Sequence, residues 1–402
     1  MFTVRRRRSL WPRLLVVLVP LLLVGGIWLG GHPSSLPGPV RDALVGDEDA
    51  RLYGEALDVI SDDYYRSVDR QRLLDASLNS AVGSLKDRFS AYFDPKAYRS
   101  FQETTEGQFE GVGMTVEEVP RGLRVMTVFK GSPAARGELH PGDTITAVNG
   151  RSIKGKSSDE ATTQIKGRAG TPVLLTLESG KRTREVRLRR AHVDVPVVES
   201  EMAESGGVKV AHVSLSSFTS GAHGAVGEAV RRLLKRGAKG VVLDLRDNGG
   251  GLLNEAVLVS SIFIPEGTIV TTRGRARPER VFEATGSSIS PKVPVVVLVN
   301  GSSASASEIV TGALQDRDRA KVVGTRTFGK GVFQEIKQLS NGGALDLTVG
   351  EYFTPKGRNL GGGGPKKGAG IDPDVTARDK RSTPKRDEAL EVAVRTVTNG
   401  KA

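Results

Sequence analysis

Short, fully apolar strands alternate with helical segments in the C-terminal half of this chain, and this pattern is the strongest constraint on its fold. Strands with one wet face alternate polar and apolar residues, whereas the run Val293–Val299 is apolar throughout. Apolar strands joined by helices are typical of a buried, mostly parallel sheet. The sequence therefore predicts an α/β layer. Its strands are expected over Val208–Val213, Gly240–Leu245, Val293–Val299 and Lys321–Gly324, with a helix over about Ala222–Arg236.

The chain before this layer has a different period. Residues 105–190 hold short strand-like runs separated by turn signals such as Asn149-Gly150, which predicts a compact β-rich domain. The runs are Gly111–Val116, Leu123–Val128, Asp143–Val148 and Val173–Leu177. Residues 51–104 repeat apolar side chains at helical spacing, which predicts a small helical segment. The α/β layer would then occupy residues 191–398, with a last helix over Asp387–Val397.

The first residues predict where the protein works. Five arginines precede an apolar run of 18 residues, Leu14 to Gly31, which would form about 27 Å of helix and cross a bilayer core. Positive charge before such a run holds the N-terminus in the cytoplasm. The alternative is a cleaved signal peptide, but no A-x-A-like site follows the run. We expect a membrane anchor over 1–31, a linker over 32–50 and a single-pass protein with an extracytoplasmic body.

The composition excludes several classes of protein. Cysteine is absent, so disulfides, thiolate catalysis and cysteine-based metal sites are excluded. The five histidines show no metal-ligand spacing, which argues against a zinc peptidase. The net charge of +12 is concentrated at the two ends of the chain, and aromatic residues make up only 5%. A nucleic-acid partner is therefore not expected, and neither is a metal or a cofactor.

Ser305 stands between an apolar strand and a helix, in the run Ser-Ala-Ser-Ala-Ser-Glu over 303–308. Two interpretations are open. Ser305 and Glu308 fit a capping box, S-x-x-E, that only begins the helix. The same helix start also presents free N–H groups and a positive dipole end, so an exposed serine there could attack a carbonyl.

A nucleophilic serine needs a base, and Lys330 is a candidate. It follows the strand Lys321–Gly324 and is flanked by Gly329 and Gly331. A free lysine with a pKa of about 10.4 is neutral in about one molecule in 2,500 at pH 7, but burial that lowers the pKa to about 8 makes it a working base. The alternative is a solvated surface lysine.

The segment Gly324–Gly331 also nearly matches the phosphate-loop pattern G-x-x-x-x-G-K-[ST]. Its last position is Gly331, which has no hydroxyl for magnesium, and Val332–Ile336 is predicted to be extended where a phosphate loop needs a helix. A nucleotide-binding protein is therefore a weak alternative.

Several motifs in one order resemble a known family. They are Leu243–Gly251, the serine run at 303–308, Ala313–Ala320 with Asp316, Thr327–Gln334, Phe353–Arg358 and Gly370–Asp374. Together with Phe109–Gly113, they make the chain similar over residues 50–398 to the carboxyl-terminal processing peptidases, which are tail-specific serine peptidases with a PDZ domain and a Ser/Lys dyad. Two departures, Asp247 and the glycine-rich stretch Gly361–Gly370, do not touch the dyad.

The resemblance implies a crotonase-like α/β peptidase core with an inserted PDZ-like β-rich domain. It implies Ser305 as nucleophile, Lys330 as base and Gln334 as the residue that orients the lysine. The backbone amides of Gly251 and Ala306 would be the oxyanion donors, and the role of Asp316 stays open. The loop Gly111, Val112, Gly113 and Met114 would bind the substrate's tail.

The expected activity is therefore that of a serine endopeptidase. It would cut near the C-terminus of extracytoplasmic or unfolded proteins, with protein or peptide tails as partners and no cofactor. The alternative from another class is a non-catalytic PDZ scaffold with a vestigial peptidase core.

Overall fold

The computed structural model describes residues 48–180, 182–364, 368–379 and 386–399. The expected anchor and most of the expected linker lie outside these residues. No helix within the described ranges has the length and apolar character needed to cross a membrane.

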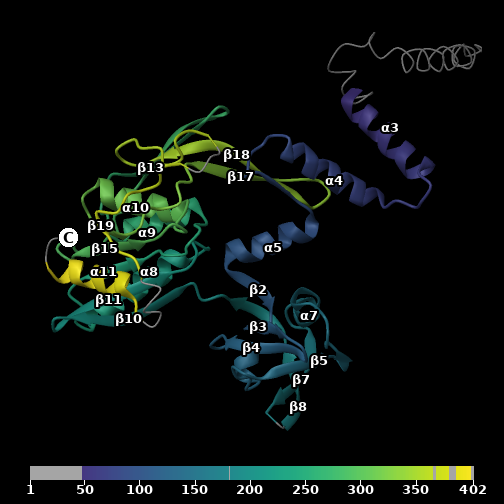
Figure 1. The fold of residues 1–402 in the computed structure, drawn as a ribbon, viewed down its shortest axis with the longest axis horizontal. Coiled ribbons are helices and arrows are strands. Elements are labelled where there is room, and N and C mark those ends of the chain that lie inside the picture. Colours follow the sequence, from purple (N-terminus) through teal and green to yellow (C-terminus); the bar gives the residue numbers. More distant parts are fainter. Residues whose placement is uncertain (1–47, 181, 365–367, 380–385, 400–402) are drawn as a thin grey trace, which may run out of the picture. The chain divides into compact units, whose positions relative to one another are not determined.

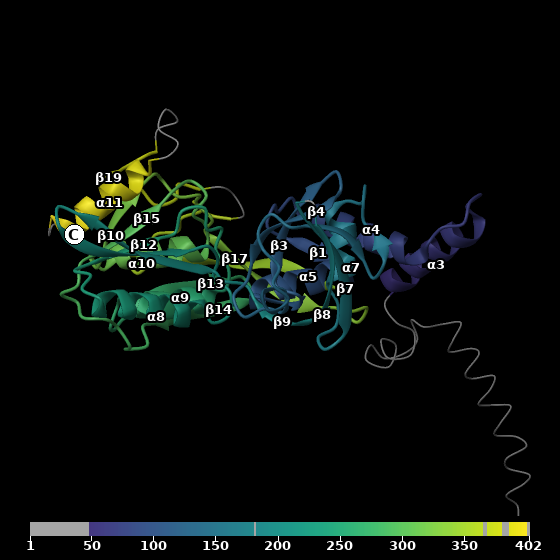
Figure 2. The ribbon, with the colours of Figure 1, turned by 90° about the horizontal axis from the view of Figure 1, so that it is seen from below.

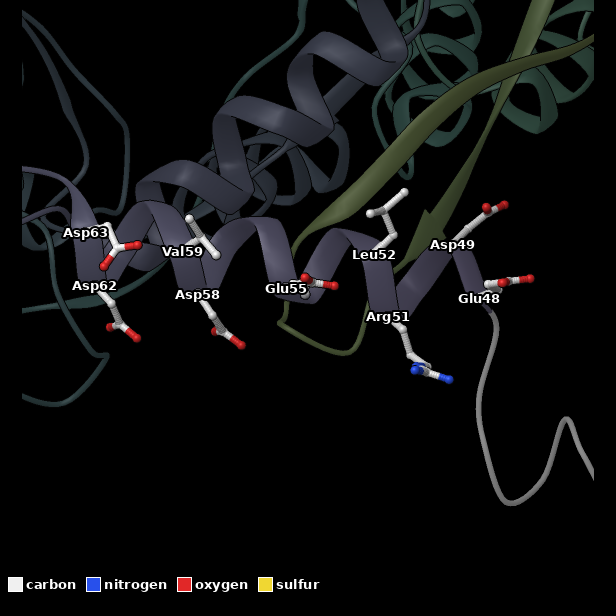
Figure 3. A pocket seen from close by; sticks show the side chains of 10 residues that line it. Glu48, Asp49, Arg51, Leu52, Glu55, Asp58, Val59, Asp62 and Asp63 are labelled. Atoms are coloured by element: carbon white, nitrogen blue, oxygen red, sulfur yellow. The ribbon is translucent and has the colours of Figure 1, made fainter. Parts of the chain in front are cut away.

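The chain divides into two compact units, 1–81 and 82–402. The described part of the first unit contains helix α3 (Glu48–Asp63) and most of helix α4 (Arg70–Gly83), where helical spacing predicted helices. A shallow hollow runs along α3, and Figure 3 shows the mostly acidic side chains that line it. Leu52 and Val59 are exposed on the same helix, whereas Leu57 is buried.

The β-rich domain of the second unit is a small sheet with short helices (Figure 1). Five strands follow one another in the order β3-β4-β5-β7-β8, and β6 pairs with β5. A separate pair, β2 and β9, connects the domain to its neighbours in sequence. The bounds are α5 (Pro95–Glu106), β2 (Gln108–Gly111), β3 (Met114–Val119), β4 (Gly122–Val128), α6 (Pro133–Arg136), β5 (Thr144–Val148), β6 (Arg151–Ser152), α7 (Ser158–Ile165), β7 (Pro172–Ser179), β8 (Arg182–Arg189) and β9 (Ala191–Asp194).

One expected strand is broken in this domain. The sequence predicted a continuous strand over Gly111–Val116, but β2 ends at Gly111 and β3 begins at Met114. The break is at Gly113, whose φ is +84°. A Cβ at Gly113 would lie 2.2 Å from Cβ of Ser132, so only glycine fits this turn.

The predicted α/β layer is present as a six-stranded sheet in the order β10-β11-β12-β15-β16-β19. All of its pairings are parallel except that of β10 with β11. The strands are β10 (Val198–Ser205), β11 (Val208–Leu215), β12 (Val241–Asp244), β15 (Val295–Val299), β16 (Lys321–Gly324) and β19 (Val375–Thr376).

Helices cover both faces of this sheet, as fully apolar strands require. One core joins the sheet to α8 (Ala222–Lys235), α9 (Leu253–Ser261) and α10 (Ala306–Asp316). A second core joins the opposite face to α11 (Glu388–Thr398). Figure 2 shows α11 on one side and α8 and α9 on the other. Successive residues of β12 alternate between the cores: Val241 and Leu243 belong to the first and Val242 to the second.

A second, antiparallel sheet completes the core. Its strands are β1 (Ala91–Phe93), β13 (Thr268–Gly274), β14 (Arg277–Glu283), β17 (Val332–Gln338) and β18 (Ala344–Phe353). β17 pairs with β18 along its whole length, and β1 also pairs with β18, with Ala91 opposite Asp346. This pairing brings the segment before β1 to the strands that follow Lys330. The extended structure of β17 agrees with the prediction for Val332–Ile336 and argues against a phosphate loop.

Candidate active site

Ser305 lies at a strained turn between β15 and α10. Its φ of +56° and ψ of −113° are unusual for a residue with a side chain. Such backbone conformations cost about 1–3 kcal/mol and persist where the surrounding structure imposes them. Here the turn is held by hydroxyl groups: Ser303 Oγ donates to the carbonyl of Leu245 at 2.7 Å, and Ser307 Oγ donates to that of Asn248 at 2.8 Å.

The loop after β12 packs against this turn. A Cβ at Gly250 would lie 2.8 Å from Cβ of Ser305 and 3.0 Å from N of Ala306, so the glycine allows the close approach. The next residue, Gly251, has φ of +143°. In the described part of the chain, the N–H groups of Gly251 and Ala306 have no protein acceptor. Both candidate oxyanion donors therefore remain available, and Ala306 begins helix α10 with its dipole end at the site.

Lys330 is placed by β17 and its neighbours. Its Nζ donates to Oε1 of Gln334 at 2.7 Å, and Gln334 Nε2 donates to Oγ1 of Thr348 on β18 at 3.0 Å. The ring centroid of Phe89 lies 4.9 Å from Nζ. The structure thus brings the candidate base and its candidate orienting residue together. Lys330 is partly buried rather than a solvated surface lysine.

Burial lowers the pKa of Lys330 below its ordinary value of 10.5. Three carboxylates oppose this effect, because negative charge favours the ammonium form: those of Asp346, Asp87 and Glu308. Desolvation outweighs them, so the amine loses its proton more readily than a free lysine does. That direction is the one a general base requires.

Glu308 ties the loops of Ser305 and Lys330 together. The capping-box interpretation is correct in one respect, since the Ser305 N–H donates to Oε2 of Glu308 at 3.0 Å. The same carboxylate also accepts the N–H groups of Gly329 and Lys330 at 2.7 and 2.9 Å, and the Thr327 hydroxyl at 2.6 Å. Burial raises the pKa of Glu308, and these hydrogen bonds counteract the rise.

Tyr352 forms a second connection between the loop of Ser305 and the loop of Lys330. Its hydroxyl donates to the carbonyl of Lys330 and lies 3.5 Å from that of Ser305. Within the described residues no hydrogen bond joins Ser305 Oγ to Lys330 Nζ, and the amine donates to Gln334. Contacts between nucleophile and base are often long in free enzymes and shorten when substrate binds.

The β-rich domain has an apolar groove where the sequence predicted tail binding. A cavity of about 230 Å³ opens between β3 and α7. Val112, Gly113 and Met114 line it, whereas Gly111 lies beside it, against the ring of Phe109. The other lining residues are Phe109, Thr115, Val116, Phe129, Thr162, Ile165, Lys166 and Val195.

Asp316, whose role the sequence left open, is buried at the end of α10. Its Oδ2 accepts the N–H of Lys356 at 2.9 Å, and its Oδ1 accepts from Arg358. These contacts fix the turn after β18.

Sequence reasoning missed Asp87, Phe89, Thr348 and Tyr352, all of which lie around Lys330. Of these four residues, only Tyr352 could have been found from the sequence, because it directly precedes the motif Phe353–Arg358.

Comparison with known proteins gives two family matches. Residues 209–377 match the model of peptidase family S41, and residues 101–178 match that of the PDZ domain. The first range contains Gly251, Ser305, Lys330 and Gln334. The second contains the apolar groove up to Lys166.

Curated relatives agree with these matches. A probable CtpA-like serine protease of Staphylococcus aureus (strain COL) is 36% identical over 320 residues, which are 79% of this chain and 62% of that protein. The chain thus spans less than two thirds of that relative. A protein of the same description from Staphylococcus haemolyticus is 31% identical over 91% of this chain and 72% of its own length.

A solved structure is also similar. The photosystem II D1 C-terminal processing protease superposes with a TM-score of 0.50 at 30% identity, covering 88% of this chain and 91% of that structure.

Proposed function

Because this chain belongs to peptidase family S41, we propose that it is a serine endopeptidase in which Ser305 is the nucleophile and Lys330 the base. The observation that carries the proposal is the state of Lys330. Its amine is desolvated and held by Gln334, and its backbone N–H is connected through Glu308 to the loop of Ser305. A vestigial core would have no reason to keep a lysine in this surrounding.

The chemistry follows from these positions. Neutral Lys330 removes the proton from Ser305 Oγ as the oxygen attacks the carbonyl carbon of the substrate. The N–H groups of Gly251 and Ala306 hold the negative charge that develops on the carbonyl oxygen. When the C–N bond breaks, the ammonium of Lys330 gives its proton to the leaving amine. Water then attacks the acyl-enzyme and Lys330 accepts the water's proton. As the C–O bond of the ester breaks, Lys330 returns that proton to Ser305 Oγ and is neutral again.

The PDZ domain indicates which substrates the enzyme would select. An extended tail would add to the edge of β3, its last side chain would enter the apolar groove, and its terminal carboxylate would meet the backbone amides of Gly111–Met114. Unfolded proteins with apolar C-termini are the substrates that fit. The basic residues and apolar run at 1–31 support a body that is anchored in the membrane and works outside the cytoplasm.

The test compares the wild type with two single variants on an unfolded protein substrate. Ser305→Ala and Lys330→Ala should each abolish cleavage, and the double variant should be hardly worse, because nucleophile and base act as a unit. Product masses identify the cut. A wild type that binds tails without cutting them would favour the scaffold alternative, and full activity of Ser305→Ala would remove Ser305 as nucleophile.

A further inference from the structure

The hydrogen bonds of Lys330 continue beyond Gln334. We propose that Asp87 is a positioning residue for the base: through Ser90 it holds β18 at Thr348, whose hydroxyl holds Gln334 and thereby orients the amine of Lys330, and its charge helps to hold the proton there. This inference rests on the proposed Ser/Lys function.

Asp87 is held as an ionised acceptor. Its Oδ1 accepts the N–H of Phe89 at 2.9 Å, and its Oδ2 accepts the hydroxyl of Ser90 at 2.5 Å. Burial alone would raise the pKa of Asp87. Hydrogen bonds from Ser90, Thr348 and Phe89 and the charge of Lys330 outweigh burial and lower the pKa. At neutral pH the carboxylate therefore accepts hydrogen bonds and cannot donate one.

Four hydrogen bonds connect Asp87 to Lys330. Ser90 gives its one hydroxyl proton to Asp87, so its oxygen accepts the N–H of Thr348, and the Thr348 hydroxyl oxygen accepts from Gln334. The amide of Gln334 then presents Nε2 to Thr348 and Oε1 to Lys330. The amine must donate to that oxygen. In the neutral amine this leaves the lone pair directed away from Gln334 and free to accept a proton.

The fold brings this acid to the base from a distant part of the sequence. The pairing of β1 with β18 places residue 91 opposite Asp346. The Thr348 N–H donates to Ser90 Oγ at 3.0 Å, across 258 positions of chain. The ring of Phe89 lies against the lysine on the same side. The segment 87–90 therefore forms part of the wall around Lys330.

A second carboxylate allows the effect of charge on Lys330 to be tested separately from the effect of hydrogen bonding. Asp346 on β18 acts on Lys330 through charge and lies outside the hydrogen-bond chain. Burial raises the pKa of Asp346, and the neighbouring charge of Asp87 raises it further, while Lys330 lowers it. Glu308 is the third acid near the amine. The neighbouring positive charge is that of Arg88, whose guanidinium lies 5.4 Å from the centroid of the same Phe89 ring that Lys330 contacts.

The test uses four variants of the full chain and pH profiles of kcat on one unfolded substrate. Asp346→Asn removes charge only. It should move the rising limb of the profile of kcat against pH to lower pH by about one unit and leave the plateau at high pH unchanged. Thr348→Val breaks the chain without removing charge and should lower the plateau by about tenfold or more. Thr348→Ser restores the hydroxyl and should restore the plateau.

Asp87→Asn should both move the rising limb of the profile and lower its plateau. It removes a charge, so the limb moves to lower pH. It also places an N–H group against the hydroxyl of Ser90, which loosens the hold on Thr348 and Gln334, so the plateau falls while KM stays within about twofold. A purely structural role would change the plateau without moving the limb.

Two results would overturn the inference. One is a folded Asp87→Asn enzyme with both plateau and limb of the wild type. The other, which applies even if that variant does not fold, is equal kcat for wild type, Thr348→Val and Thr348→Ser. Failure of the proposed function itself would look different, because Ser305→Ala would then keep the wild-type activity.

Discussion

The backbone N–H groups of Ser305 and Lys330 donate to one and the same oxygen, Oε2 of Glu308, at 3.0 and 2.9 Å. The candidate nucleophile and base are thus connected through their main chains, although they are 25 positions apart in sequence. This shared acceptor keeps the loops that carry them in register. The Thr327 hydroxyl and the Gly329 N–H donate to the other oxygen, Oε1, and only an ionised carboxylate accepts four donors on its two oxygens.

Glu308→Gln should therefore disturb both loops. The amide places an N–H group against backbone donors, and each buried donor that loses its partner costs about 1–3 kcal/mol. We expect kcat/KM to fall by about 100-fold or more and the free energy of unfolding to fall by about 1–3 kcal/mol. Chemical denaturation and peptide cleavage measure the two effects. Glu228→Gln, on the exposed surface of α8, is the matched control and should change neither; a Glu308→Gln enzyme with wild-type kinetics would contradict the role of this carboxylate.

The activity should depend on pH through Lys330. Only the neutral amine accepts a proton, so kcat should rise with pH, and burial places the midpoint below the free lysine value of 10.5. Lys330→Arg retains the positive charge but cannot lose its proton in this range, so it should be inactive at every pH. Steady-state rates between pH 6 and 10 give the profile. A flat profile, or measurable turnover by the arginine variant, would exclude lysine as the base.

The close approach of the two loops makes Gly250 sensitive to substitution. A methyl group there would meet Cβ of Ser305 and N of Ala306, and the φ of +107° is unfavourable for alanine. Gly250→Ala should lower kcat by about 100-fold or more through the displaced oxyanion donors. Its neighbour provides the control, because a Cβ at Gly249 meets nothing within 4 Å. Similar rates for Gly250→Ala and Gly249→Ala would show that this contact does not matter.

His212 should make the stability depend on pH. Burial alone would lower its pKa, but hydrogen bonds to Asp244 and Glu201 at 3.1 and 3.2 Å raise it above 6.5. A raised pKa in a histidine means that its stabilising effect is complete below pH 6.5 and is lost as pH rises through the folded-state pKa. His212→Gln keeps a polar side chain but cannot titrate. The melting temperature of the wild type relative to this variant should decrease from pH 6 to pH 8.5, and a constant difference would refute the assignment.

The sequence predicted some of these features and missed others for a physical reason. Strand β15 is apolar along its length, and β12 and β16 are apolar except for one terminal residue each, so their burial is visible locally. The serine run and the Lys330 segment are local motifs as well. Asp87 reaches Lys330 only because β1 pairs with β18, and no local pattern encodes that pairing. The break at Gly113 likewise depends on Ser132, a contact between two turns.

The last prediction concerns the PDZ groove. An unfolded substrate with an apolar C-terminal residue should be cut faster than the same chain ending in an amide. Hydrogen bonds to the carboxylate and burial of the last side chain together are worth about 2–4 kcal/mol, or roughly 30- to 1,000-fold in kcat/KM. The groove itself is tested by filling it. Thr162 lines the cavity, whereas Thr163 is exposed on the same helix. Thr162→Trp should erase the preference for the free acid, while Thr163→Trp should retain it. Equal rates for acid and amide in the wild type would mean that this domain does not read tails.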